Sequence, residues 1–167
     1  MEYPNRFFKQ YGAEREDNTI LRLSARHAVL FYGFGTDTEI GGEPQGYRYR
    51  KDYDHIPSLA EIKTDIEELI NSRVRETILS GFTYEGKPVW LSTANQRNFA
   101  SPHTLPVRFK LGEDADGNAV YHTFDTEQEL VAFRTAIADF INAASVEGWD
   151  EKDSIDYSVY KEGLKQP

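Results

Sequence analysis

The chain has 167 residues and carries 28 acidic against 19 basic side chains, a formal net charge of −9 at pH 7. This length predicts one domain, and no apolar run approaches the roughly 20 residues that a membrane span needs. The charge balance argues against nucleic-acid partners, which require concentrated positive charge. The absence of cysteine excludes disulfides and thiolate chemistry. The N-terminus lacks a signal-peptide pattern, so we expect synthesis in the cytoplasm and no membrane partner.

Residues 1–56 are predicted to form a β-rich N-terminal segment, either separate or part of the same domain. Short strands are expected at 19–24, 27–34 and 46–53, where apolar and aromatic residues are separated by glycine-rich turns. The run EIGGEPQG, residues 39–46, is typical of a flexible loop.

The clearest predicted element is a helix from residue 59 to 80, near the start of the longer portion of the chain, 57–167. Ser58 and Glu61 have the spacing of a capping box, in which the serine hydroxyl accepts from the Glu61 backbone NH and the glutamate side chain reaches back. Apolar residues recur every three or four positions, so we expect one face of the helix to be buried.

Two hairpins and a short helix are predicted to follow. The hairpins turn at Glu85-Gly86 and at a loop rich in glycine and aspartate. Their strands are expected at 82–84 with 89–91, and at 107–111 with 119–124. The short helix spans about 93–100 and has Ser92 as its cap.

A second long helix is predicted to begin after Asp125 or Thr126 and to end before Gly148. Trp149 is expected to fold back on its last turn, and the final residues, KEGLKQP, are expected to fray. The predicted fold class is therefore α+β: a small antiparallel sheet or hairpins packed with two main amphipathic helices, and the β-rich N-terminal segment.

The candidate metal and catalytic groups have unsuitable spacing. Residues 114–118, DADGN, resemble a calcium loop, but the ligand register around Gly117 fails and a plain hairpin turn is favoured. Asp52, Asp54 and His55 lack a second histidine nearby, so they are interpreted as a polar approach to the first helix. We therefore expect no enzyme activity, no catalytic residue, no metal and no cofactor.

Tyrosines 47 and 49 are candidates for a binding surface. They alternate with Arg48 and Arg50, so both tyrosines fall on one side of a strand and both arginines on the other. The tyrosine side could stack on a sugar or on a ring of a partner. The alternative places the tyrosines on the core and the arginines in water.

The run SGFTYEGKPVWLSTANQRNF, residues 80–99, allows two interpretations. In the first, Tyr84 and Trp90 pack the hairpin against the first helix, and Gln96 bonds to backbone. In the second, Trp90, Gln96 and Asn98 form a patch that binds a glycan or a partner. The complete candidate patch is Tyr84, Trp90, Gln96, Asn98, Tyr47 and Tyr49.

Several motifs follow one another between residues 47 and 157. They are IEELIN, GFTYEGKPVWLSTANQRNF, LPVRFK and GWDEKD. This series of helix, GF-x-Y-x-G hairpin and S-x-x-N-Q element resembles a domain-of-unknown-function family found in phage tail-fibre and related prophage proteins. One departure is that Ala100-Ser101-Pro102 stops a helix that runs longer in the family.

The resemblance implies a non-catalytic phage or prophage tail-associated protein with a structural or assembly role. Its expected partners are other tail proteins or further copies of itself, and its expected location is the cytoplasm when synthesised and then the virion if it is structural. Three alternatives remain open: a carbohydrate-binding or carbohydrate-modifying module, a module that binds a host partner, and an acidic inhibitor of a host protein.

Overall fold

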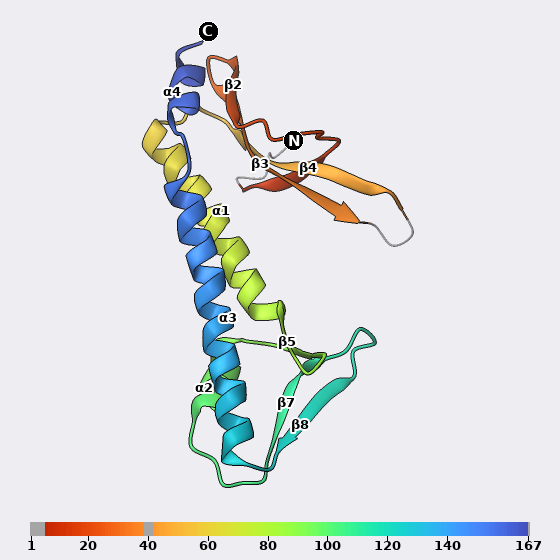
Figure 1. Ribbon diagram of the computed structural model, residues 1–167. Coiled ribbons are helices and arrows are strands. Elements are labelled where there is room, and N and C mark those ends of the chain that lie inside the picture. The colour runs from red at the N-terminus through yellow and green to blue at the C-terminus, as the bar shows by residue number, and fades with distance from the viewer. Residues whose placement is uncertain (1–5, 39–41, 167) are drawn as a thin grey trace. The chain divides into compact units, whose positions relative to one another are not determined.

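The computed structural model describes residues 6–38 and 42–166 and has an α+β fold, as predicted (Figure 1). Contacts divide the chain into two compact units. The first unit comprises Met1–Leu69 with Ile155–Pro167, and the second comprises Ile70–Ser154. Each unit is described by itself below.

The first unit contains a four-stranded antiparallel sheet in the order β1-β4-β3-β2. Its strands are β1 (Phe8–Tyr11), β2 (Thr19–Ser24), β3 (His27–Thr38) and β4 (Pro44–Tyr53). The predicted strands correspond to β2, β3 and β4, whereas β1 was missed because four residues carry too little alternation to be distinctive. The predicted loop at 39–46 is partly wrong, since β4 begins at Pro44; residues 39–41 lie outside the described residues.

Helix α4 (Ser158–Lys165) packs on this sheet and corrects the expectation that the end of the chain frays. Tyr160 is fully buried, and its hydroxyl donates to the Phe31 carbonyl at 3.4 Å. At Gly163, an added Cβ would lie 2.8 Å from the Ile20 backbone oxygen, so the glycine permits close approach of the helix to β2. A buried aromatic anchor thus orders a segment whose composition alone looks polar.

A buried ion pair joins the sheet to the first turns of α1 (Leu59–Ser80). Lys51 Nζ lies 2.7 Å from Asp65 Oδ2, and only 7% of Lys51 is exposed. The Tyr53 hydroxyl donates to the same carboxylate oxygen at 2.6 Å. Burial, followed by this hydrogen bond, raises the pKa of Tyr53, so the phenol remains a donor to the half-buried Asp65 carboxylate.

The second unit is built from the end of α1, two hairpins, a short helix and a long helix, as predicted. The second strand of the first hairpin lies at Lys87–Val89, so its predicted position at 89–91 is wrong by two residues. Its elements are β5 (Phe82–Tyr84), β6 (Lys87–Val89), α2 (Thr93–Ala100), β7 (Val107–Glu113), β8 (Ala119–Phe124) and α3 (Glu127–Asp153). Aromatic rings dominate its core: Phe133 is fully buried and lies 4.9 Å from the Tyr84 ring and 5.3 Å from the Phe99 ring, centroid to centroid. This core gives the hairpins a shared hydrophobic base.

Helix α3 continues through Gly148, so the predicted end at that residue is wrong. Trp149 does not fold back on the helix and is 57% exposed. The glycine instead serves close packing, because an added Cβ would lie 2.6 Å from Val74 Cγ2 on α1. Sequence alone cannot distinguish a glycine that ends a helix from one that admits a neighbouring helix.

Helix starts follow the predicted capping with one difference. The hydroxyls of Ser58, Ser92 and Thr126 each accept from the backbone NH three residues later. The Glu61 carboxylate, however, does not close the capping box and contacts His55 Nε2 at 2.9 Å. His55 Nδ1 meets the Asp54 carboxylate, also at 2.9 Å, so the imidazole lies between two acids at the start of α1.

The position of His55 between two carboxylates should make its contribution to the free energy of unfolding depend on pH. Hydrogen bonding to Asp54 and then to Glu61 raises the pKa of His55 above its ordinary 6.5. A raised folded-state pKa means that the contribution is fully present below the unfolded pKa and is lost as pH rises through the folded pKa. We expect wild type to exceed His55→Gln in free energy of unfolding by more at about pH 5.5 than at about pH 8.5. Urea unfolding at both pH values measures this difference, and an equal gap at the two would contradict the assignment.

Candidate functional site

Residues 80–99, which were predicted to contribute a binding patch, mostly make contacts within the second unit. Tyr84 is half-buried, and its ring contacts those of Phe133, His122 and Phe124 at 4.9, 5.4 and 5.9 Å between centroids. Burial raises the pKa of its phenol. Tyr84 therefore belongs to the aromatic core and does not form an open platform.

The polar residues of the same run mostly satisfy local backbone. Gln96 Nε2 donates to the Leu91 carbonyl at 2.7 Å, and Asn95 Nδ2 donates to the Trp90 carbonyl at 2.8 Å. Trp90 is 39% exposed, but its ring lies over Gly112, where an added Cβ would be 3.0 Å from Trp90 Cδ1. Asn98 is exposed on α2. Packing within the second unit thus accounts for Tyr84 and Gln96, but the aromatic partners differ from the prediction: Tyr84 contacts rings of β8 and α3, and Trp90 lies on β7, where packing on the first helix was expected. Trp90 and Asn98 retain exposed surface.

Tyr47 and Tyr49 lie in the first unit and are joined by a tyrosine that the sequence did not single out. Their rings are 5.5 Å apart, edge to face, and the Tyr11 ring lies 6.0 Å from that of Tyr47. Tyr11 is opposite Tyr47 in the antiparallel register of β1 and β4. We call Tyr11, Tyr47, Tyr49, Lys9 and Asp37 the tyrosine face.

Glycines of β3 form the floor of the tyrosine face. An added Cβ at Gly35 would lie 2.5 Å from the Tyr47 ring, and one at Gly33 would lie 3.8 Å from the Tyr49 ring. The β3–β4 register shifts between Tyr32 and Gly35, where a bulge bends the strand. The Tyr47 ring therefore lies directly on the Gly35 backbone, which restricts its freedom before any partner arrives, whereas the Tyr49 ring would make only an ordinary van der Waals contact with a Cβ at position 33.

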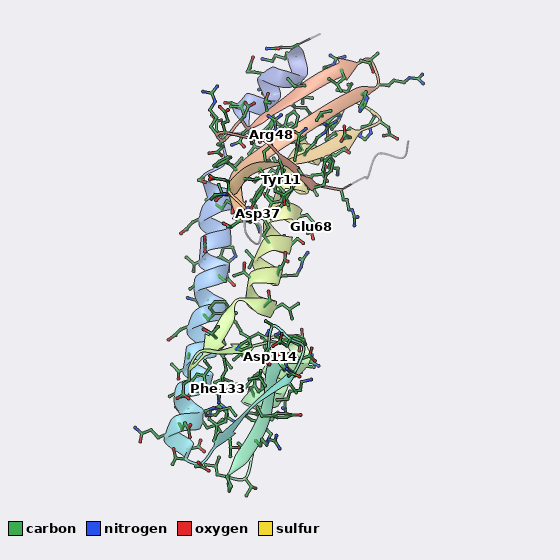
Figure 2. All side chains as sticks on the ribbon, turned by 90° about the vertical axis from the view of Figure 1, so that its right-hand side faces the viewer. Tyr11, Asp37, Arg48, Glu68, Asp114 and Phe133 are labelled. Carbon is green, nitrogen blue, oxygen red and sulfur yellow. The ribbon has the colours of Figure 1, made fainter. Side chains whose placement is uncertain are left out.

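A charged pair completes the tyrosine face. Lys9 Nζ lies 2.8 and 3.0 Å from the two Asp37 carboxylate oxygens, and the Tyr11 hydroxyl donates to Asp37 at 2.7 Å. Tyr11 and Asp37 are labelled in Figure 2. The Lys9 ammonium also lies 4.2 Å from the Tyr47 ring centroid. Hydrogen bonds from Lys9 and then Tyr11 lower the pKa of Asp37, and the Asp37 bond raises the pKa of Lys9. Both groups consequently keep their charges at neutral pH.

Arg48 and Arg50 alternate with the tyrosines and occupy the opposite side of β4, where they make specific contacts. The Arg48 guanidinium carbon lies 3.6 Å from the Phe31 ring centroid, and Arg50 forms two hydrogen bonds to the buried Asp52 carboxylate. Neither arginine simply projects into water, and the half-buried tyrosines are not in a sealed core. The strand presents two structured faces, one aromatic and one cationic.

A hollow of about 340 Å³ lies where β1 ends, and we call it the β1 hollow. It is lined by Gln10, Tyr11, Gly12, Ala13, Glu14, Arg15, Asp17 and Arg48. Tyr11 thus belongs both to the tyrosine face and to this hollow. Its volume falls near the lower end of the range for small-molecule sites, about 300–1,000 Å³.

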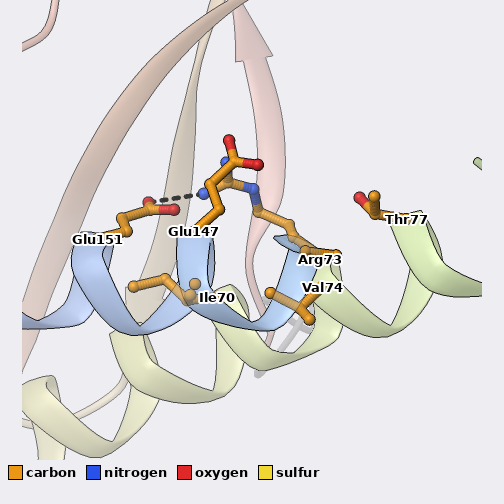
Figure 3. Close-up of a pocket in the computed structure, with 8 residues that line it drawn as sticks. Ile70, Arg73, Val74, Thr77, Glu147 and Glu151 are labelled. Carbon is orange, nitrogen blue, oxygen red and sulfur yellow. Dashed lines mark hydrogen bonds and ion pairs between the residues drawn. The ribbon is translucent and has the colours of Figure 1, made fainter. Parts of the chain in front are cut away.

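A smaller hollow of about 80 Å³ lies in the second unit between α1 and α3 (Figure 3). Arg73 Nη1 donates to Glu151 Oε1 at 2.8 Å along its wall. Ile70, Val74 and Gly148 line its base. This volume is well below that of ordinary ligand sites and marks a helix packing seam.

A histidine in the second unit bridges two hairpin strands and the start of a helix. His122 Nε2 lies 3.0 Å from Glu129 Oε1, and Nδ1 lies 3.1 Å from Lys87 Nζ. An ammonium only donates, so Nδ1 accepts and Nε2 donates to the carboxylate. The His122 bond lowers the pKa of Glu129. Both ring nitrogens are occupied, and the arrangement ties β6 and β8 to the start of α3.

The candidate calcium loop is a turn of the β7–β8 hairpin. Asp114 Oδ1 accepts from the backbone NH groups of Asp116 and Asn118 at 2.9 and 2.8 Å. Across residues 6–38 and 42–166, no group of three or more His, Asp and Glu side chains is arranged to hold a metal ion. In the same ranges, no helix combines the length and apolarity that crossing a bilayer requires.

Comparison with protein-family models, curated proteins and solved structures finds no match for this chain.

Proposed function

We propose that this chain is a non-catalytic phage or prophage tail-associated protein that docks another tail protein through its tyrosine face. The tail association rests on the motif resemblance between residues 47 and 157. The docking role rests on one observation, the cluster of Tyr11, Tyr47 and Tyr49 on a glycine floor beside a charged pair.

The chemistry of the tyrosine face suits a protein partner. Protein interfaces commonly combine an aromatic centre with a polar rim, and tyrosine is among the residues that contribute most binding energy. Here Tyr11 is 49% exposed, while Lys9 and Asp37 keep about a third of their side chains accessible. The Tyr47 ring, which is held against Gly35, loses little further entropy on binding.

The tail association is tested by quantitative mass spectrometry of purified particles from an induced producing strain. We expect this chain to copurify with tail proteins at a stoichiometric level. Its absence from particles, despite expression in the lysate, would contradict a structural role in the virion and leave only transient assembly.

The docking role is tested by the double variant Tyr11→Ala/Tyr47→Ala. We expect at least about a tenfold loss of association with particles, because buried interface aromatics each contribute roughly 2 kcal/mol or more. The matched control is Tyr121→Ala, which removes an exposed tyrosine from β8 in the second unit. Unchanged association of the double variant, with its fold verified by circular dichroism, would overturn the assignment of the tyrosine face.

A further inference from the structure

The two edges of the sheet in the first unit differ. The sheet has the order β1-β4-β3-β2. Helix α4 approaches the β2 edge closely, because a Cβ added at Gly163 would lie 2.8 Å from the Ile20 carbonyl oxygen. At the other edge, three of the four residues of β1 are exposed. Across residues 6–38 and 42–166, no strand other than β4 pairs with β1, so β1 is an edge to which a further strand can be added.

The register shows which backbone groups of β1 face this edge. The Gly12 NH donates to the Gly46 carbonyl at 2.9 Å, so the backbone of Gly46 points toward β1. In an antiparallel ladder alternate residues point to the same side, and the unbroken β1–β4 register makes Phe8 and Gln10 the residues that bond to β4. The NH and C=O of Lys9 therefore point away from β4. In the part of the chain that the structure describes, no backbone hydrogen bond outside the sheet involves Lys9.

Strand β1 lacks the features that usually keep an edge strand from pairing. Such strands are commonly protected by proline, by a β-bulge or by a charged side chain, especially lysine. The sequence of β1, FKQY, has no proline, and its register with β4 is unbroken. Lys9 is bound by both carboxylate oxygens of Asp37, at 2.8 and 3.0 Å, so its charge is compensated. An extended segment can therefore approach this edge without meeting an unpaired lysine.

The side chains of β1 indicate the character of such a segment. Successive residues of a strand point to opposite faces, so Phe8 lies on the side opposite Lys9 and Tyr11. Phe8 is 36% exposed, and an apolar cross-strand neighbour would cover its ring. Arg6 is exposed just before the strand, and the run 6–13 contains two basic residues and no acidic one. An extended segment with an apolar residue against Phe8 and an acidic residue near Arg6 is complementary to this edge.

We propose that an extended, acidic segment of the partner tail protein adds to the sheet as a fifth strand along β1 and forms hydrogen bonds with the Lys9 backbone. In strand addition, main-chain hydrogen bonds supply affinity and alternate side chains supply specificity. Every second side chain of the added strand would lie beside Lys9 on the tyrosine face, so one partner would use both the face and the edge. This inference rests on the proposed docking role and states how the partner is held.

Hydrogen exchange of the full chain, purified and within particles, tests the strand addition. Amides that gain a strand partner are protected, so we expect exchange in residues 7–11 to slow at least about tenfold in particles. The edge strand β8 of the second unit is the control and should keep the rates of the purified chain. Unchanged rates in 7–11, in particles that contain the chain, would overturn strand addition and leave tyrosine-face docking intact. Absence of the chain from particles would instead overturn the tail association, and this inference with it.

A pair of variants separates the backbone of Lys9 from its side chain. Lys9→Pro and Lys9→Ala both remove the ammonium, but only proline removes the NH that faces the edge. We expect Lys9→Pro to associate with particles about three- to tenfold more weakly than Lys9→Ala, the effect of one hydrogen bond. Equal association of the two variants, with both folds verified by circular dichroism, would overturn the proposal.

Charge reversal tests the acidic character of the segment. Arg6→Glu should weaken association with particles at least about threefold, because it places a carboxylate beside an acidic strand. Arg26→Glu makes the same change of charge at the exposed turn between β2 and β3 and should leave association unchanged. Equal effects of the two variants would overturn an acidic segment at this edge.

A second copy of the chain is the competing occupant of the β1 edge. Sedimentation velocity of the purified chain over a range of concentrations detects it, and we expect no dimer that depends on β1. A concentration-dependent dimer that Lys9→Pro abolishes and Lys9→Ala retains would assign the edge to a second copy and overturn the proposal.

Discussion

Replacing Phe133 by alanine is expected to lower the free energy of unfolding of the second unit by about 3–5 kcal/mol. The ring is fully buried and lies 4.8–5.3 Å from the rings of Phe124, Tyr84 and Phe99. Its removal deletes apolar burial and leaves a cavity where both hairpins and α2 meet α3. Both tryptophans of the chain, Trp90 and Trp149, belong to this unit, so urea unfolding followed by tryptophan fluorescence reports on it directly.

Two variants calibrate the Phe133 result. Val131→Ala removes a side chain that is 49% exposed on the same helix and should change stability by no more than about 0.5 kcal/mol. Phe133→Leu keeps much of the side-chain volume, so its loss of stability should lie between those of Val131→Ala and Phe133→Ala. A loss below about 1 kcal/mol for Phe133→Ala would contradict the central place of this ring in the core.

Replacing Asp65 by alanine is expected to destabilise the first unit by about 3–5 kcal/mol, because it leaves the Lys51 ammonium buried without its carboxylate. Lys51 is 7% exposed and lies 2.7 Å from Asp65, and the Tyr53 hydroxyl would lose its acceptor as well. The loss of stability comes from leaving the Lys51 ammonium and the Tyr53 hydroxyl buried without a partner. It does not measure the net contribution of the ion pair to stability. Hydrogen exchange of the β3 and β4 amides measures the stability of the first unit separately from that of the second.

Control variants on the same helix separate the buried pair from surface charge. Glu67 lies 3.9 Å from Lys63 in an exposed i,i+4 pair, so Glu67→Ala should cost no more than about 0.5 kcal/mol. Asp65→Asn keeps an acceptor for the Tyr53 hydroxyl, so it should lower the free energy of unfolding by less than Asp65→Ala does. Equal protection of the sheet amides in wild type and Asp65→Ala would contradict a structural role for the pair.

Local signals predicted most of the helices and hairpins. The first helix, the two hairpin turns and the short α2 helix depend on caps, periodicity and turn residues that lie within a few positions of one another. The errors occurred where tertiary packing decides the outcome. Gly148 continues α3 because Val74 needs the space, and α4 is ordered because Tyr160 is buried against the sheet.

The sequence predicted only two residues of the tyrosine face, Tyr47 and Tyr49. Alternation correctly placed Tyr47 and Tyr49 on one side of the strand and the two arginines on the other, because all four residues belong to β4. Tyr11 and Lys9 were missed because the pairing of β1 with β4 joins residues about 40 positions apart. Asp37 reaches the same face from β3, which pairs with β4 on its other side. The weak FKQY alternation was the available signal. In the hairpin run, aromatic type alone could not distinguish the core position of Tyr84 from the exposed position of Trp90.

Docking through the tyrosine face is tested most directly by site-specific photocross-linking. A photoreactive phenylalanine analogue would replace Tyr47 in one variant and Tyr121 in a matched control, each incorporated into particles and irradiated. We expect a cross-link from position 47 to one tail protein and none from position 121. A cross-link from position 121 alone, or none from position 47 in particles that contain the chain, would contradict docking through the tyrosine face.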